Sequence, residues 1–571
     1  MRRLAAHYGR IRSEYPDDQL LIVFDIDGTI LDMRHMVRHV LLSFDRAHGS
    51  GWFHGLTADD VTVHENQVDQ LLRDMALPAS IAERAYRFYL EQRWQPEAVL
   101  AAHRPYQGVL DVIRWFQIQP DTSVALNTGR PEHLRSQTLQ SLNALGEEYR
   151  VRFSSELLHM NPRTWEQGVA QTKVAALTAF RDAGYRVFAV VDNEPGNIRA
   201  MAEADAASEV LFLHACTLYE SAGKPTPRTV SGDAYDITAL VSEREVPQHV
   251  QMVWHGVNDE WNLRQFLASR VTWGECDLRV DPFGRLVLRH DSFEDTPWRA
   301  EEQLLRLPEL VDAFSAHDRG LKLDLKQPRH DVLQAALELL DGRLPEDRLW
   351  FNATIDSLGE AGFRELAASY PMSIRQCPID FLAPLVFSAP GRAKELLDML
   401  RGWGVNRFSI AWGTPHTRRL FDQFERWGHD VNIYAVPDLA AFLQAALLLP
   451  RSLTADFNFP QWHYFGRGSG VHLDHHTYRL DRPRRSQPTE SSDGEGARGA
   501  LAGRAGLARN SQSMGTRRRQ RRRLRSPDRV VRSRASRTPG PTRDEALAFG
   551  VAGEPGRAAT KVDPSDLRPA D

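Results

Sequence analysis

The sequence is poor in cysteine and in long apolar runs. Three cysteines, Cys216, Cys276 and Cys377, stand far apart in the 571 residues and form no CxxC pair. This spacing argues against a disulfide framework or a zinc ribbon and favours a reducing compartment. No stretch approaches the roughly 18 consecutive apolar residues of a membrane-spanning helix. The first residues also lack the apolar core of a signal peptide. We therefore expect a soluble, cytoplasmic protein without a transmembrane segment.

The chain also lacks a strong excess of one charge. It carries 71 Lys and Arg against 75 Asp and Glu, a formal net charge of −4. This balance says nothing about partners, because it averages over unlike parts. The length exceeds what one ordinary hydrophobic core supports, so two or three domains are expected.

The first part, residues 1–215, alternates short apolar runs with helical stretches. The apolar runs lie at 20–26, 123–128, 185–191 and 209–214. Runs of this kind, separated by helices, predict buried parallel strands of a doubly wound α/β fold. A mostly helical segment at about 33–104 is too long for a simple crossover and suggests an inserted cap.

Turn and loop composition at 216–248 indicates a linker. A second α/β pattern then fills 249–466, starting with the apolar run at 250–256. Further strand candidates lie at 274–280, 285–290, 321–326, 348–354, 372–377, 407–412, 431–436 and 453–457. Eight parallel-type runs over about 215 residues suit a (β/α)₈ barrel.

The last part, 467–571, is rich in Arg, Gly, Ser, Pro and Ala. Such a segment cannot bury enough apolar surface to fold, so we expect a disordered basic tail. Its arginines between Arg517 and Arg537 could contact a polyanion such as nucleic acid or a membrane surface. No aromatic residues or reader motif accompany them, so a non-specific contact or no function is the better interpretation.

Two carboxylates follow the first apolar run. Asp25 and Asp27 stand at i and i+2, and Gly28-Thr29 turns the chain. This spacing places both carboxylates on one side of a strand, at the edge where sites of open α/β sheets lie. A polar strand end with a turn is the plain alternative, but the complete DxDGT pattern with a further Asp32 is far more demanding than that.

This pattern resembles the haloacid dehalogenase (HAD) superfamily of phosphohydrolases. Three further motifs of that superfamily have counterparts here in the expected order. Thr128 ends an apolar strand, Lys173 precedes the last acidic strand, and Asp192 follows it.

The resemblance implies a role for each of these residues. Asp25 would attack phosphorus and form an aspartyl-phosphate, while Asp27 would act as general acid and then general base. Thr128 and Lys173 would hold the phosphoryl oxygens. Mg²⁺ would bind Asp25, the backbone carbonyl of Asp27, and Asp192.

Asn193 and Arg130 lie next to the motif residues and could also take part in the site. The superfamily often has two acids in its last motif, and here Asn193 and Glu194 follow Asp192. Asn193 can still bind a metal through its oxygen or through water. Arg130, just after the second motif, could contact phosphate, although an arginine after a glycine is more often a solvated loop residue.

A second group of polar residues opens the barrel-like part. His255 ends its first strand, Glu275 and Asp277 alternate on the next run, and His290 follows after thirteen more residues. Each has an ordinary structural explanation by itself. Together, at strand ends of a barrel, they indicate a metal-assisted site.

This arrangement resembles the glycerophosphodiester phosphodiesterase-like superfamily of TIM-type barrels, which includes spider sphingomyelinase D toxins and the menorin family. The stretch GECDLRVDPFGRLVLRHDSF matches its ExD and HD signature, and LKLDLK supplies Asp324 with Lys326 two residues later. The segments LKLDLK, WFNATI and FSIAWGT look most like the menorin branch, and TADFNFP resembles the closing strand.

By that resemblance, His255 and His290 would serve as general base or nucleophile and as general acid on a phosphodiester. A divalent cation, Mg²⁺ or Ca²⁺, would be held by Glu275, Asp277 and Asp324. Two departures stand out. Gly256 replaces the usual arginine, and Asp324 replaces the more frequent glutamate. Trp412, at a late strand end, could contact substrate, although core packing is the more common role.

The sequence therefore predicts a two-domain phosphoric-ester hydrolase acting on small-molecule phosphate esters. A catalytically inactive barrel that serves as a binding or scaffold module is the alternative. The barrel could also supply the monoester that the first domain dephosphorylates. Mutases and dehalogenases use a similar nucleophile, so the phosphatase reaction follows from the resemblance alone.

Overall fold

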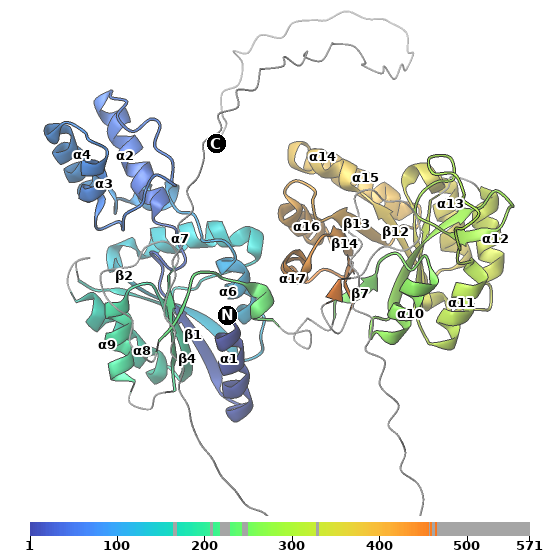
Figure 1. The fold of residues 1–571 in the computed structure, drawn as a ribbon, viewed down its shortest axis with the longest axis horizontal. Coiled ribbons are helices and arrows are strands. Elements are labelled where there is room, and N and C mark those ends of the chain that lie inside the picture. The colour runs from blue at the N-terminus through green and yellow to red at the C-terminus, as the bar shows by residue number, and fades with distance from the viewer. Residues whose placement is uncertain are drawn as a thin grey trace, which may run out of the picture. The chain divides into compact units, whose positions relative to one another are not determined.

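A computed structural model describes residues 1–163, 168–205, 209–216, 229–241, 249–326 and 330–455, with two short strands beyond (Figure 1). Those two strands, β16 (Phe457–Asn458) and β17 (His463–Tyr464), form an antiparallel pair. The predicted basic tail at 467–571 and parts of the predicted linker lie outside the described residues. No described helix has the length and apolar character needed to cross a bilayer.

The first part contains a six-stranded sheet in the order β3-β2-β1-β4-β5-β6, with every pairing parallel. Its strands are β1 (Gln19–Phe24), β2 (Thr122–Pro131), β3 (Leu158–Asn161), β4 (Tyr185–Asp192), β5 (Leu211–Ala215) and β6 (Val230–Gly232). The four strands predicted for 1–215 are confirmed, and β3 was not predicted because its run is short.

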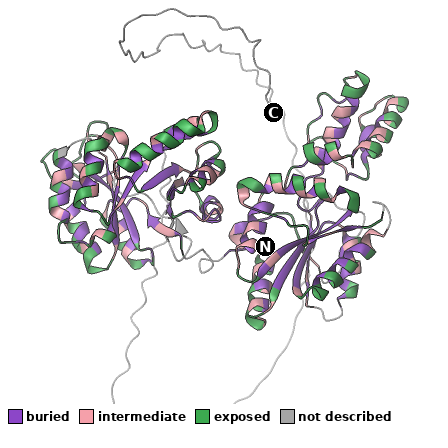
Figure 2. Ribbon diagram, turned by 180° about the vertical axis from the view of Figure 1, so that it is seen from behind, coloured by how far each residue is buried: buried purple, intermediate pink, exposed green. Residues whose placement is uncertain are grey.

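Helices cover both faces of this sheet, whose strands are largely buried (Figure 2), as its alternating apolar side chains require. Leu20, Ile22 and Phe24 of β1 belong to one buried cluster, and Leu21 and Val23 belong to another. The first cluster includes side chains of α1 (Arg2–Glu14), α6 (Val109–Gln117) and α7 (Arg135–Gly146). The second includes side chains of α8 (Val169–Asp182) and α9 (Pro195–Ala204).

The segment predicted as a cap is helical. It holds α2 (Arg34–His48), α3 (Val68–Asp74), α4 (Ala79–Gln92) and α5 (Pro96–Ala101). Helix α2 ends at Gly49, whose left-handed φ of 59° is a common way to stop a helix. The segment that leads from residue 62 to α3 contains His64 and Glu65.

Part of the segment expected to be a linker belongs to the first sheet. Strand β6 pairs with β5, and the Tyr235 hydroxyl donates to the Thr29 backbone carbonyl at 2.8 Å. Gly108, at φ +80°, lies so close that an added Cβ would sit 2.3 Å from the Tyr235 carbonyl oxygen. Residues 229–241 therefore pack as a component of the first α/β unit.

The second part contains a closed barrel of eight parallel strands. They are β7 (Gln251–Trp254), β8 (Trp273–Val280), β10 (Gly320–Leu325), β11 (Leu349–Asn352), β12 (Ile374–Pro378), β13 (Arg407–Ala411), β14 (Val431–Val436) and β15 (Ser452–Ala455). The pairings β8–β10 and β15–β7 complete the circle. The predicted (β/α)₈ architecture is confirmed.

The surrounding helices are α10 (Glu260–Ala268), α11 (Leu307–Ala316), α12 (His330–Leu340), α13 (Ile355–Ser369), α14 (Ala383–Ser388), α15 (Pro390–Gly402), α16 (Thr417–Arg426) and α17 (Leu439–Ala446). Asp259 and Asp438 begin α10 and α17, and each carboxylate accepts from a backbone N–H in the first turn. Such caps satisfy donors that the helix itself leaves open.

One predicted barrel strand was wrong. The run at 285–290 forms β9 (Leu286–Leu288), which pairs antiparallel with β8 as the second arm of a hairpin. A parallel crossover needs about a dozen residues. Only a tight turn that includes Gly284 separates the two arms, so the chain can only fold back.

Candidate functional sites

Asp25 lies at the carboxyl end of β1 and is buried. Its backbone N–H donates to the Val191 carbonyl at 2.8 Å, which fixes the chain next to β4. Its carboxylate accepts from the Thr29 hydroxyl at 3.0 Å and from Lys173 Nζ at 2.5 Å. Burial raises the pKa of Asp25 to about 7, with Lys173 acting in the opposite direction. A bound divalent cation would favour the ionised form that a nucleophile needs.

Lys173 comes from α8 and is almost completely buried. Its ammonium donates to Asp25, to Asp192 Oδ2 at 2.8 Å and to the Asn127 carbonyl at 2.6 Å. Burial disfavours the charged form, but Asp192 and Asp25 outweigh it and raise the pKa of Lys173. The sequence-predicted residues Asp25, Lys173 and Asp192 are therefore brought together.

Asp192 ends β4, and its Oδ1 accepts from the Glu194 backbone N–H at 2.8 Å. Asn193 is buried against Gly28, where an added Cβ would lie 2.2 Å from the Asn193 amide nitrogen. Gly28 also has a φ of +78°, so both the turn and the close approach require glycine. The Asn193 side chain therefore lies directly against the DxDG turn that carries Asp25.

Arg130 differs from the expectation of a solvated loop residue, which was wrong. It is completely buried, and its Nε and Nη2 donate to the two oxygens of Asp27 at 2.8 and 2.6 Å. A guanidinium matches a carboxylate in this two-bond geometry, which fixes the orientation of both groups. The sequence could not reveal this contact, because 103 residues separate the partners.

His103 supports Arg130 from the other side. Burial lowers the pKa of His103 to about 2, and the Arg130 charge adds to the effect. The ring is therefore neutral, and its Nε2 accepts from Arg130 Nη2 at 3.0 Å. Its Nδ1 then carries the hydrogen and donates to the Ser141 hydroxyl at 2.6 Å. Asp27, Arg130 and His103 form one continuous buried chain of hydrogen bonds.

A cavity of about 540 Å³ opens in front of these carboxylates. It is lined on one side by Asp25, Asp27, Gly129, Lys173 and Asn193. Thr128 is fully buried and is not among the lining residues. Its hydroxyl accepts from the Arg130 backbone N–H at 3.1 Å. Its phosphoryl contact stays a prediction.

The cap supplies a polar wall to the same cavity. This wall consists of His64, Glu65, Asn66 and Arg93, with Glu194 from the core beside them. His64 Nε2 lies 3.0 Å from Glu194 Oε1. The sequence analysis did not identify these residues, because nothing in a turn before a helix marks which side chains reach across to another segment.

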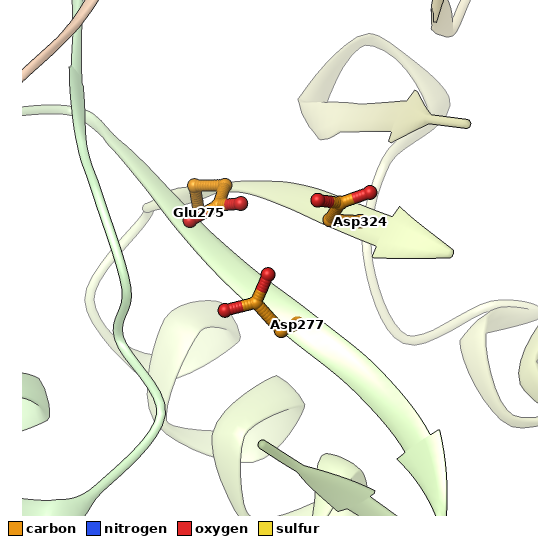
Figure 3. A group of neighbouring side chains, drawn as sticks. All are labelled: Glu275, Asp277 and Asp324. Carbon is orange, nitrogen blue, oxygen red and sulfur yellow. The ribbon is translucent and has the colours of Figure 1, made fainter. Parts of the chain in front are cut away.

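The barrel gathers the three predicted metal carboxylates at one place (Figure 3). Glu275 and Asp277 extend from β8 and Asp324 from β10, and one oxygen of each lies within 4.8 Å of the others. The parallel register sets Asp324 opposite Asp277 and Lys322 opposite Glu275. Among the described residues, this is the group of three carboxylates that fits a metal ion.

Two lysines balance the charge of this group. Lys326 Nζ lies 3.1 Å from Asp277 Oδ1 and 2.6 Å from Asp324 Oδ2. Asp277 is buried, which raises its pKa, but Lys326, His290, His255 and the Asn258 amide together outweigh the burial and hold the pKa of Asp277 well below its usual value. Lys322 is buried, which lowers its pKa, and its ammonium donates to the Thr454 hydroxyl at 3.0 Å.

The loop after β7 fixes the same carboxylates. The Gly256 backbone N–H donates to Glu275 Oε2 at 2.8 Å, and His255 Nε2 lies 3.6 Å from that oxygen. Asn258 bonds Asp277 twice, because its amide donates to Asp277 Oδ2 at 2.6 Å and its carbonyl accepts from the Asp277 backbone N–H at 2.8 Å. Asn258 is a positioning residue that the sequence analysis missed.

A cavity of about 340 Å³ lies above the barrel carboxylates and is lined by His255, His290, Glu275 and Asp324 among others. His290 Nδ1 lies 3.1 Å from Asp291 Oδ1. Trp412 is not one of the lining residues, and it packs against the apolar core with the Arg418 guanidinium over its ring. The two predicted histidines thus share a cavity with the predicted metal ligands.

Both donor sets suit a hard divalent cation. Carboxylate and amide oxygens are the ligands that Mg²⁺ and Ca²⁺ prefer. The barrel offers three carboxylates. The first site offers the carboxylate of Asp25, after β1, and the carboxylate of Asp192 with the side-chain oxygen of Asn193, at the end of β4.

No protein-family model and no curated protein matches the sequence. Similar solved structures include a glycerophosphodiester phosphodiesterase from Thermotoga maritima, 13% identical, with the match covering 36% of this chain and 95% of that chain at a TM-score of 0.29. An Oleispira antarctica phosphodiesterase in complex with sn-glycerol-3-phosphate is 17% identical over 38% of this chain and 96% of that chain, at a TM-score of 0.30. A HAD-superfamily hydrolase from Geobacter sulfurreducens is 14% identical over 39% of this chain and 95% of that chain, at a TM-score of 0.26. Both kinds of protein that the sequence resembles are thus among these structures.

Proposed function

We propose that the chain is a phosphoric-ester hydrolase with two catalytic domains. A domain at 1–215, extended by the residues around β6, would hydrolyse phosphomonoesters, and the barrel at 249–466 would hydrolyse phosphodiesters. One observation carries the proposal. The buried Asp25 carboxylate is held by Thr29 and Lys173 at the wall of a cavity that also contains Asp27.

The monoester reaction would proceed in two steps. Asp25 attacks phosphorus, the bond from phosphorus to the leaving oxygen breaks, and Asp27 gives its proton to that oxygen. Asp27 then takes a proton from water, whose oxygen attacks the aspartyl-phosphate, so that inorganic phosphate leaves and Asp25 is regenerated. Lys173 offsets the phosphoryl charge during both steps. Arg130 keeps Asp27 in one orientation.

Asp25, the Asp27 carbonyl, Asp192 and Asn193 would hold a Mg²⁺ ion, which would neutralise charge on the phosphoryl oxygens. In the barrel, Glu275, Asp277 and Asp324 would hold a divalent cation with the same purpose.

In the barrel reaction, the two histidines would divide the proton transfers. One histidine takes a proton from water while the water oxygen bonds to phosphorus, the bond from phosphorus to the leaving oxygen breaks, and the other histidine donates a proton to that oxygen. The lining residues of the cavity include no arginine, and Lys322 and Lys326 are the lysines that face it. These ammonium groups would meet the phosphate charge at the point where Gly256 offers no side chain.

The two reactions can operate in series, because a diesterase produces the phosphomonoester that a phosphatase consumes. Deletion of the barrel should then abolish phosphate release from a diester while monoester hydrolysis remains. Persistent diester turnover without the barrel would refute the coupling.

The proposal is tested on the full chain with two chromogenic substrates and Mg²⁺. Asp25→Asn should reduce p-nitrophenyl phosphate turnover by at least about 10³-fold, as expected for loss of a nucleophile. His255→Ala should remove bis-p-nitrophenyl phosphate turnover, and each variant serves as the folding control for the other site. Asp69→Asn, which alters an exposed ion pair with Arg73, is a matched surface control.

Retained monoester turnover in Asp25→Asn would refute the aspartyl-phosphate mechanism. The rival function for the barrel is ligand binding without catalysis, which the absent arginine at Gly256 favours. Binding of a diester without any His255-dependent hydrolysis would support that rival.

A further inference from the structure

The polar wall that the cap presents to the first cavity contains a buried carboxylate, one oxygen of which has an ion-pair contact with His64 but accepts no hydrogen bond from the described residues. Glu65 is 6% exposed and lines the cavity together with Asp25 and Asp27. Its Oε2 accepts no hydrogen bond from any residue that the structure describes. His64 Nε2 lies 3.3 Å away and offsets the charge. A buried acceptor of this kind is costly unless a ligand supplies the donor.

The position of Glu65 is fixed by its neighbours in the cap. Its backbone carbonyl accepts from the Tyr89 hydroxyl at 2.9 Å and from Arg93 Nη1 at 3.4 Å. The His64 ring is oriented as well, because its Nδ1 accepts from the Asn66 backbone N–H at 3.2 Å. The hydrogen of a neutral His64 ring is therefore on Nε2, the atom that faces Glu65 and Glu194. The polar wall is organised before any substrate arrives.

The charges of this wall select a kind of leaving group. The two carboxylates Glu65 and Glu194 both lie against the His64 ring, and the Arg93 guanidinium lines the same cavity, so the wall has little net charge. A carboxylate on the leaving group would meet Glu65 and be repelled. An alkyl leaving group would give the Glu65 oxygen no hydrogen-bond donor. A neutral hydroxyl group avoids both costs.

A hydroxyl group of the substrate can form a hydrogen bond with Glu65 whether or not the Glu65 carboxyl group is protonated. Burial raises the pKa of Glu65, and His64 acts in the opposite direction. A hydroxyl group can donate to an ionised carboxylate, and it can also accept from a protonated one. A purely cationic donor fits only the first of these forms.

We propose that the first site is selective for monophosphates of polyols, with Glu65 binding a hydroxyl group of the leaving group. This inference rests on the proposed monoester hydrolysis at Asp25. It adds a specificity-determining residue and a substrate class to that reaction.

The test compares three esters of similar size: glycerol 1-phosphate, n-propyl phosphate and 2-phosphoglycolate. Wild type should show a kcat/KM for glycerol 1-phosphate at least about tenfold above each of the others, because a site built to bind a hydroxyl rejects analogues without it. Glu65→Leu should reduce the ratio of glycerol phosphate to propyl phosphate at least about tenfold. Glu65→Gln, which keeps an acceptor oxygen, should retain most of the ratio.

Glu83→Leu is the matched control, since Glu83 is an exposed glutamate of α4 that pairs with Arg87. It should leave the ratio unchanged. Equal turnover of glycerol and propyl phosphate by wild type, or a uniform loss in Glu65→Leu, would overturn the inference while Asp25-dependent hydrolysis of p-nitrophenyl phosphate upholds the proposed function. Absence of Asp25-dependent turnover on all four esters would overturn both.

Discussion

The first site and the barrel site collect the same charges but hold them in different ways. Each combines three carboxylates with two cations at the carboxyl ends of parallel strands. The first set is Asp25, Asp27, Asp192, Lys173 and Arg130, and the barrel set is Glu275, Asp277, Asp324, Lys322 and Lys326. In both, one lysine joins two carboxylates of neighbouring strands. The one unit of negative charge that remains in each set favours binding of a cation.

The bridging lysines differ in how firmly they are held. The side chain of Lys173 is 1% exposed and donates to three oxygens. The side chain of Lys326 is 24% exposed, contacts two carboxylates and follows the end of β10. Lys173 is therefore part of the core of its domain, whereas Lys326 is held less firmly, and we expect it to move aside if a divalent cation binds. The same set of charges is therefore held rigidly by its lysine in the first site and less rigidly in the barrel site.

Replacement of the two lysines should separate these roles most clearly. Lys173→Met leaves Asp25 and Asp192 buried without their cation, and we expect a loss of about 3 to 5 kcal/mol in the free energy of unfolding. Lys326→Met should cost less, about 1 to 2 kcal/mol, because Lys326 and Asp324 are partly exposed to water, although Asp277 is buried. Urea unfolding in EDTA, followed by circular dichroism, measures both.

Lys394→Met, which removes an exposed pair with Asp398, is the control for loss of a surface lysine. Equal losses of stability for Lys173→Met and Lys326→Met would show that the two lysines have the same role, contrary to this interpretation.

The second cation of the first site gives the next largest effect. Arg130→Met frees Asp27 from its two-bond contact, and we expect kcat for p-nitrophenyl phosphate to fall about 10²-fold from misplacement of the general acid and base. Arg130→Lys should recover only part, since a lysine cannot make both bonds. Arg87→Met, which removes an exposed arginine paired with Glu83, serves as the control. A change in KM alone would show that Arg130 contacts substrate instead of orienting Asp27.

The smallest effect concerns the ligand set. Asn193→Asp would give the proposed metal ligands of the first site a third carboxylate, beside Asp25 and Asp192, as in the barrel. We expect the Mg²⁺ concentration for half-maximal monoester turnover to fall a few-fold, roughly 1 kcal/mol. The same change in a Glu275→Gln chain, followed by calorimetry, reports cation binding at the first site without the barrel. Weaker binding would show that Asn193 lies outside the ligand set.

The strand-end carboxylates could be predicted because strand periodicity determines them. Glu275 and Asp277 alternate along β8, Asp25 and Asp27 directly follow β1, and parallel strands end at one edge of a sheet or barrel. The residues that orient them could not be predicted. Asn258 meets Asp277 through a loop whose path only the folded barrel defines.

The errors have the same origin. The run at 285–290 has the composition of a barrel strand, yet the short turn before it decides its direction. Arg130 has the local sequence of a loop, yet the folded sheet brings it to Asp27. The composition of a segment limits which structures it can form. Contacts with residues distant in sequence then determine which of these structures it adopts.

Strand β6 lies beyond the expected domain boundary at residue 215, and this changes how the first domain can be isolated. A fragment ending at Ala215 would lack β6 and leave the open backbone of β5 as the edge of the sheet, a known cause of aggregation. It would also lose the Tyr235 hydroxyl that donates to the Thr29 carbonyl, four residues from Asp25. An independent phosphatase unit therefore has to extend through Val241, and failure of a shorter fragment would report on its truncated sheet instead of its chemistry.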